Sequence, residues 1–132
     1  MRFALMIYCK AESWGHPVFL RTKEAQALPE PERDKLLQEM NELFAEISAS
    51  GELVGGEALP APTTTRTVSV RNGTTRVADG PLAPSSEEQL AGWFILDCAD
   101  RDRAEQIAAR LPDAPFGFVE VRPLLSDSGE NM

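Results

Sequence analysis

The strongest constraint on the fold comes from two short segments in which every residue is apolar. The first runs from Phe3 to Tyr8, and the second is the run Trp93-Phe94-Ile95-Leu96. Alternate side chains of a β-strand point to opposite faces, so each of these strands offers apolar groups to both faces. A strand of this kind is covered on both sides. The fold therefore needs one layer packed on each face of its sheet.

Helical spacing of apolar residues predicts two helices. The first is expected from about Pro31 to Ala49, with Gly51 as its stop. The second is expected to begin after Asp100, which suits a helix N-cap, and to end at Pro112. Further strands are expected at 53–59, 66–71, 74–78 and 116–122, with Asn72-Gly73 forming the turn of a hairpin between the middle two.

The expected order is strand, helix, strand, hairpin, strand, helix, strand. Without the hairpin this is a βαββαβ unit, so we predict an α+β fold of the ferredoxin-like type with an inserted β-hairpin. Both helices would lie on one face of the sheet and leave the other bare. A second copy could cover that face, which predicts a dimeric α+β barrel formed through the sheet face; a monomer is the alternative. Residues 1–125 are expected to form one domain, and residues 126–132 a disordered tail.

Charge and composition exclude several classes of protein. The chain has 13 Lys and Arg against 21 Asp and Glu, a net charge of −8, which argues against nucleic-acid binding. No stretch is long and apolar enough to predict a membrane span, and the first residues lack the layout of a signal peptide. Cys9 and Cys98 are therefore expected to be reduced thiols in a cytoplasmic protein. No zinc, dinucleotide or serine-hydrolase motif occurs, so we expect no metal and no cofactor.

Several segments resemble one protein family. Asp79-Gly80-Pro81-Leu82 resembles the Asp-Gly-Pro-Phe signature of the DGPF-domain branch of the YCII-related family, with Leu82 in place of the usual Phe. The segments 51–59, 66–73, 88–94 and 119–123 resemble other parts of the family pattern, in the right order. The connection 9–28 is longer than in the family pattern.

The resemblance implies a dimeric α+β barrel without a settled activity. Related YCII proteins are suspected of acid–base chemistry by a His–Asp pair, and some DGPF proteins are thought to accompany sigma factors. His16 does not match the family motif, so this role is not carried over to it. We interpret His16 as a surface loop residue.

Three carboxylates are the candidate catalytic residues: Asp79, Glu57 and Glu88. Asp79 would be held by a Gly-Pro turn at a cleft, and its alternative is an ordinary turn residue. Glu57 is a charge within a predicted strand, where a buried carboxylate is costly unless paired. If the three carboxylates lie close together, their mutual repulsion would raise the pKa of one of them. The same cluster could bind a hard cation through oxygen ligands, although the spacing of the three residues matches no calcium-binding loop.

The candidate substrate-binding residues are Tyr8, Trp93 and Phe118, which could line an apolar pocket or belong to an ordinary core. Cys9 and Cys98 end apolar strands and are more typical of small buried residues than of nucleophiles. Three functions stay open. The first is a cofactor-independent enzyme or binding protein for a small molecule. The second is a non-enzymatic accessory protein linked to sigma-factor regulation. The third is a structural dimer without a ligand.

Overall fold

The computed structural model describes residues 1–125; the predicted disordered tail lies outside the described residues. Four strands form an antiparallel sheet in the order β2-β5-β1-β6, and β3 and β4 form a separate two-stranded sheet. The α+β class predicted from the sequence is confirmed. The strands are β1 (Arg2–Cys9), β2 (Leu53–Ala58), β3 (Arg66–Arg71), β4 (Thr74–Asp79), β5 (Gln89–Asp97) and β6 (Gly117–Pro123). The helices are η1 (Val18–Arg21), α1 (Lys23–Gln26), α2 (Glu30–Ala49), η2 (Pro62–Thr64), α3 (Arg101–Arg110) and α4 (Asp113–Phe116).

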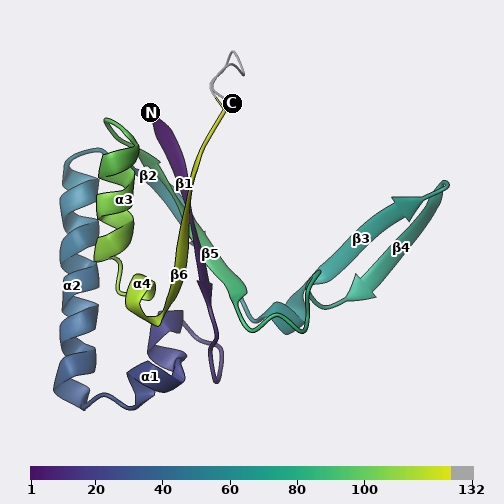
Figure 1. Ribbon diagram of the computed structural model, residues 1–132, viewed down its shortest axis with the longest axis horizontal. Coiled ribbons are helices and arrows are strands. Elements are labelled where there is room, and N and C mark those ends of the chain that lie inside the picture. The colour runs from purple at the N-terminus through teal and green to yellow at the C-terminus, as the bar shows by residue number, and fades with distance from the viewer. Residues whose placement is uncertain (126–132) are drawn as a thin grey trace.

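The core lies between α2, α3 and one face of the four-stranded sheet. Phe3, Leu5 and Ile7 of β1 are buried on this face, because every second strand residue points the same way. Leu43 and Ile47 of α2 pack against them, one helical turn apart. Figure 1 shows α2 and α3 on one side of this sheet. The two long helices are close to their predicted bounds, and the Asp100 side chain accepts a hydrogen bond from the Arg103 amide (2.9 Å), as expected of an N-cap.

No helix of residues 1–125 covers the second face of the sheet. Along β6, Val119 and Val121 pack against the core, whereas Phe118 and Glu120 alternate with them and are exposed. Phe118 is 63% exposed although it is a large apolar side chain. We call this surface the open face. The second copy that would close it into a barrel stays a prediction.

The hairpin β3–β4 follows the prediction from Asn-Gly. Asn72 and Gly73 both adopt positive φ, 51° and 76°, which is the backbone of the tight turn that matches strand twist. The hairpin projects away from the rest of the chain (Figure 1). It leaves after β2 and returns to β5, two strands that are hydrogen-bonded neighbours.

The long connection after β1 is ordered by two short helices, which the sequence analysis did not predict. Phe19 is fully buried and stacks on Phe116, with ring centroids 6.2 Å apart. The buried Thr22 hydroxyl donates to the Phe19 carbonyl and accepts from the Ala25 amide, which caps α1. Phe19 therefore anchors this segment to the domain, and Thr22 fixes the local turn between η1 and α1.

An ion-pair network joins Glu52, the residue before β2, to both long helices. The Arg103 guanidinium donates to both carboxylate oxygens of Glu52, at 2.8 and 2.9 Å, and lies 3.6 Å from Glu46. Arg110 also contacts Glu46. Two parallel hydrogen bonds between one guanidinium and one carboxylate fix the orientation of both groups as well as their distance. The network therefore fixes the position of α2 and α3 relative to the start of β2. Within residues 1–125, no helix combines the length and the hydropathy needed to cross a membrane.

Candidate functional site

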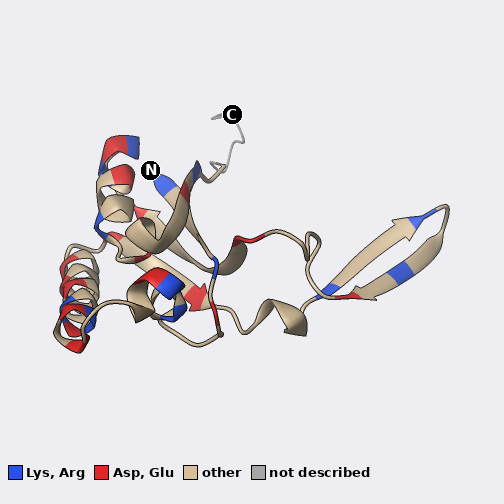
Figure 2. Ribbon diagram, turned by 60° about the horizontal axis from the view of Figure 1, so that its bottom comes forward, with Lys and Arg blue, Asp and Glu red and all other residues tan. Residues whose placement is uncertain are grey.

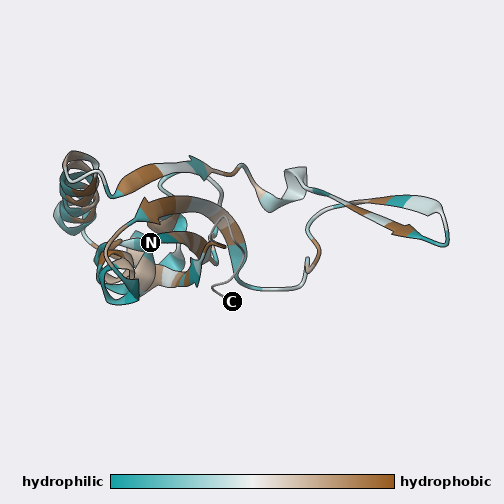
Figure 3. Ribbon diagram, turned by 90° about the horizontal axis from the view of Figure 1, so that it is seen from above, coloured by the Kyte–Doolittle hydropathy of each residue, from teal (hydrophilic) through white to brown (hydrophobic). Residues whose placement is uncertain are grey.

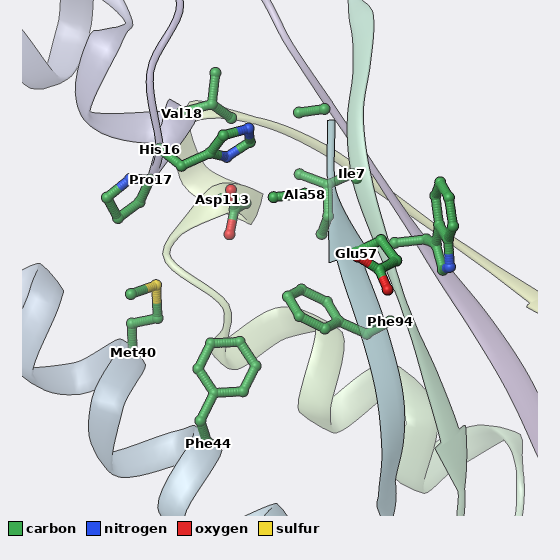
Figure 4. Close-up of a pocket in the computed structure, with 14 residues that line it drawn as sticks. Ile7, His16, Pro17, Val18, Met40, Phe44, Glu57, Ala58, Phe94 and Asp113 are labelled. Carbon is green, nitrogen blue, oxygen red and sulfur yellow. The ribbon is translucent and has the colours of Figure 1, made fainter. Parts of the chain in front are cut away.

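A pocket of about 390 Å³ lies between α2, the β2–β5 edge of the sheet and the segment 16–18. Its size is within the range of small-molecule sites. Figure 4 shows Met40 and Phe44 of α2 facing Phe94 of β5 across its lower part. The walls there are apolar, and further apolar lining comes from Ile7, Pro17, Val18, Ala58, Ala91 and Trp93.

Two glycines let β2 and β5 form this wall. A Cβ on Gly56 would lie 2.5 Å from a ring carbon of Phe94 and 2.6 Å from the Trp93 carbonyl oxygen. A Cβ on Gly92 would lie 2.5 Å from the carbonyl oxygen of Glu57. No side chain fits at these separations, so the Phe94 ring can occupy the space over Gly56 and meet Phe44, with ring centroids 5.0 Å apart. Within the Gly55-Gly56 pair the close approach is thus at Gly56, whereas a Cβ on the neighbouring Gly55 would meet no atom within 4 Å.

Asp113, the first residue of α4, is the buried carboxyl of the pocket. It is only 8% exposed. Burial raises its pKa from the ordinary 3.8 to about 6, and a hydrogen bond from its own backbone and the charge of His16 oppose that rise. A carboxyl group with a pKa this close to neutrality suits proton transfer better than an ordinary one.

His16 reaches the same end of the pocket from the connection after β1. Its Nε2 lies 2.6 Å from the carbonyl oxygen of Leu59, which also accepts a hydrogen bond of 2.9 Å from Trp14 Nε1. A carbonyl oxygen can only accept, so Nε2 carries the proton, and in the neutral ring Nδ1 is left with a lone pair. Figure 4 shows His16 and Asp113 beside each other above the apolar walls.

The geometry is therefore a mostly apolar pocket with His16 and Asp113 at one end. The sequence pattern of the YCII-related domain matches residues 1–126. The chain belongs to the YCII-related family. It is also similar to an uncharacterised protein of Rhizobium meliloti (strain 1021), with 33% identity over 95 residues, which cover 70% of this chain and 76% of that protein.

The pocket of this YCII-related chain is not lined by all three of the carboxylates that the sequence suggested as catalytic residues. Glu57 borders the pocket, but it pairs directly with Trp93 in the sheet. Directly paired residues point to the same face, and Trp93 points opposite to its neighbour Phe94. The Glu57 side chain thus lies on the open face, away from Asp113. Of the predicted substrate-binding residues, Trp93 borders the pocket.

Asp79 and Glu88 lie outside the pocket lining. Asp79 ends β4 at the base of the hairpin, where its side chain is 89% exposed and 3.5 Å from Arg66. Glu88 is half-buried, and one of its carboxylate oxygens is buried without a hydrogen-bond partner. Within the described part of the chain, no three His, Cys, Asp or Glu side chains gather closely enough to hold a metal ion. The structure does not bring the three predicted carboxylates together.

The other candidates also lie away from the pocket. Tyr8 and Phe118 are directly paired on the open face. Burial, followed by the neighbouring Glu120, raises the pKa of Tyr8. Cys9 and Cys98 are free and buried, and burial raises the pKa of the Cys9 thiol to about 12, so it is a thiol and not a thiolate at neutral pH.

Sequence reasoning missed Asp113 and set aside its partner. His16 is exposed, as predicted for a loop residue, yet it lines the pocket. Asp113 follows Leu-Pro, where the sequence predicts the end of a helix and nothing more. The only available signal was the presence of a single histidine in an unusually long connection.

Proposed function

We propose that this YCII-related chain binds a small, mostly apolar molecule in the pocket and acts on it by proton transfer without a cofactor. The observation that carries this proposal is Asp113, a carboxyl group nine-tenths buried at the end of an apolar pocket, beside His16. The narrower assignment to the DGPF branch rests on the sequence motifs and stays a prediction.

Each residue of the pair has a distinct role. Asp113 with a pKa of about 6 is largely ionised at neutral pH, and it is a stronger base than an ordinary carboxylate. It accepts a proton from a carbon of the ligand and returns it to another atom of the same molecule, which is an isomerisation. His16 is held by Leu59 and lies where its charge stabilises ionised Asp113.

The lining also limits the class of ligand. None of the described residues that line the pocket is Lys or Arg. A carboxylate or phosphate placed there would meet Asp113 and have only His16 as a counter-charge, so its desolvation would be poorly compensated. The Phe44 and Phe94 rings suit an apolar ring or short alkyl group. We therefore propose neutral ligands in place of anionic ones.

A thermal-shift screen tests the proposal. Neutral cyclic ketones, lactones and enones are compared with matched carboxylic acids, on the wild type, Asp113→Asn and Asp79→Asn at one protein concentration. A ligand at 100 times its Kd adds about 2.7 kcal/mol, a readily measured shift. We expect neutral hits on the wild type and on Asp79→Asn, with the shift lost or reduced in Asp113→Asn.

The chemistry is tested on the hits. Incubation of each hit in D₂O with wild type, followed by NMR, reports proton abstraction as deuterium incorporation. Incorporation by Asp79→Asn but not by Asp113→Asn is the expected result. If a ligand's binding is lost in Asp79→Asn but kept in Asp113→Asn, the ligand binds at the base of the hairpin and not in the pocket. No hit from any class would favour the accessory protein linked to sigma-factor regulation.

A further inference from the structure

The polar end of the pocket accepts hydrogen bonds and offers none. His16 Nε2 lies 2.6 Å from the Leu59 carbonyl oxygen, so the free polar atom of the neutral ring is Nδ1, which carries a lone pair. Asp113 has a pKa of about 6 and is an ionised carboxylate above neutral pH. Among residues 1–125, no side chain donates a hydrogen bond to Nδ1 or to this carboxylate. Both groups can accept a hydrogen bond from a ligand, and neither can donate one.

The rest of the described lining adds no donor side chain inside the pocket. Met40, Phe44 and Phe94, which form its lower walls, have no N–H or O–H group in their side chains. Trp93 has an indole N–H, but its side chain points to the open face, as does that of Glu57. If Asp113 removed a proton beside the carbonyl of a simple ketone, the resulting enolate oxygen would therefore find no donor side chain, and its burial would be costly.

A hydroxyl group on the carbon next to the carbonyl removes this difficulty. The hydroxyl can donate to His16 Nδ1, and it lies beside the oxygen on which the negative charge develops. An ammonium group is also a donor, but it would form an ion pair with Asp113, lower the pKa of that carboxyl and so weaken it as a base. The lining is thus suited to a neutral ligand that brings its own hydroxyl donor.

The surroundings of the pocket favour an apolar hydroxy ketone over a phosphorylated one. Helix α2, which forms one wall, carries six Asp or Glu residues and two Arg or Lys residues, a net charge of −4. Figure 2 shows this excess of acidic over basic residues along α2. In Figure 3, α2 alternates between hydrophobic and hydrophilic positions, and the strands of the four-stranded sheet carry hydrophobic segments. The Phe44 and Phe94 rings lie 5.0 Å apart and can contact an aromatic ring of the ligand.

We propose that the substrate is a neutral α-hydroxy ketone with an apolar ring, and that the site exchanges the positions of its carbonyl and hydroxyl groups. This inference rests on the proposed function, because Asp113 is again the base that moves a carbon-bound proton. It adds the class of substrate and a second proton path through His16.

The reaction balances without a co-reactant. Asp113 removes the proton from the carbon that bears the hydroxyl; the electron pair of that C–H bond forms a carbon–carbon double bond, and a carbonyl electron pair moves onto the carbonyl oxygen. The hydroxyl proton passes to His16 Nδ1 and from Nδ1 to the former carbonyl oxygen. Asp113 then returns its proton to the former carbonyl carbon, while a new carbonyl forms at the first carbon. Nothing is oxidised or reduced overall.

Three matched ligands test the substrate class on the wild type. Phenylacetylcarbinol is a neutral α-hydroxy ketone with a phenyl ring; phenylacetone lacks its hydroxyl, and the methyl ether of phenylacetylcarbinol cannot donate. Calorimetry measures the three Kd values, and NMR in D₂O at pH 8 follows deuterium incorporation and conversion to α-hydroxypropiophenone. We expect conversion at least about tenfold faster than in buffer, and a Kd at least about tenfold higher for each of the two ligands without a donor.

Variants separate the two proton paths. His16→Gln can still donate to Leu59 and offers an amide oxygen as an acceptor, but an amide does not carry a proton from one oxygen to another. It should bind phenylacetylcarbinol within about threefold of wild type and incorporate deuterium, while conversion falls at least about tenfold. Asp113→Asn should lose deuterium incorporation and conversion alike. Asp79→Asn, which changes a carboxylate outside the pocket lining, should match the wild type in both.

The outcomes distinguish this inference from the proposed function. If phenylacetone binds and incorporates deuterium as well as phenylacetylcarbinol does, and Asp113→Asn abolishes the exchange, the hydroxy ketone is wrong and proton transfer at Asp113 stands. Conversion by His16→Gln at the wild-type rate would overturn the path through His16. If the wild type incorporates deuterium into neither ligand, or Asp113→Asn retains the exchange, both proposals fail. The comparison of ligands on the wild type decides the substrate class even if a variant does not fold.

Discussion

His16 Nε2 and the Leu59 carbonyl oxygen are 2.6 Å apart, and this contact joins the connection after β1 to the residue that follows β2. Leu59 is itself fixed to the sheet, because its amide donates to the Ala91 carbonyl (2.9 Å). The position of the His16 ring is therefore set by the sheet edge and not by the conformation of a free loop. A site held in this way needs little reordering when a ligand binds.

Removal of His16 should raise the pKa of Asp113 above its value of about 6. The charge of His16 lowers that pKa in the wild type, so both His16→Gln and His16→Ala should raise it. His16→Gln can still donate to Leu59 and should keep its stability, whereas His16→Ala should lose about 1 kcal/mol. Titration of the carboxyl carbons by ¹³C NMR measures the pKa. An unchanged pKa in both variants would show that the ring does not act on Asp113.

The stability of the wild type should fall as pH rises from about 4 to about 6, relative to Asp113→Asn. The folded pKa is raised from 3.8 to about 6, so the folded state binds more protons than the unfolded state within this window. The stability contributed by the protonated carboxyl is thus present below pH 4 and lost above pH 6, by about 3 kcal/mol. Urea unfolding of both proteins from pH 4 to 7 measures the difference; a difference that does not vary with pH would contradict the prediction.

Gly56→Ala should destabilise the protein by about 2 kcal/mol, because the new methyl group would clash with the Trp93 carbonyl and the Phe94 ring. The neighbouring Gly55 is the matched control. A Cβ there would meet no atom within 4 Å, so Gly55→Ala should change stability by less than about 1 kcal/mol. The urea concentrations at the unfolding midpoints of the two variants measure this difference. Equal midpoints would contradict the prediction and mean that β2 and β5 can move apart at Gly56 at little cost.

Loss of the Arg103–Glu52 contact should weaken the protein above pH 4.5. Hydrogen bonds from Arg103, followed by that from Ser50, lower the pKa of Glu52 from 4.5 to about 2. The folded pKa is depressed, so this stability is present above pH 4.5 and lost as pH falls towards 2. Arg103→Met should cost about 1 kcal/mol at pH 7, because partial exposure to solvent weakens the pair.

A double-mutant cycle with Glu52→Gln isolates this contact from the other contacts of Arg103. The coupling free energy between the two substitutions should be about 1 kcal/mol or more at pH 7 and should disappear near pH 2. A coupling free energy that is the same at both pH values would mean that the ionised pair is not its source.

The elements with strong periodic patterns were predictable from the sequence. β1, α2 and the hairpin each carry a repeat or turn signal within one segment, and local sequence is enough to specify them. The short helices η1, α1 and α4 were not predictable. Each has four residues, and they depend on contacts such as that of Phe19 with Phe116, almost a hundred residues apart.

The candidate site was less accessible to sequence reasoning for the same reason. Glu57 was expected to be unusual because it is a charge within a strand, but whether it faces the pocket depends on the strand register. Asp113 is a candidate because it is buried, and that burial arises where α4 meets the β1 end of the sheet and η1. A pattern within one segment contains no information about such a meeting point.

The position of the hairpin in the chain determines where the protein can tolerate insertions and deletions. The chain leaves the sheet at Ala58 and re-enters it at Gln89, and these ends belong to strands that are already neighbours. Insertions or deletions between 60 and 87 therefore alter no pairing within the four-stranded sheet, and exposed segments of this kind tolerate length changes best. The same segment is where a reporter peptide or a foreign loop can be spliced in while the pocket on the helical side keeps its walls.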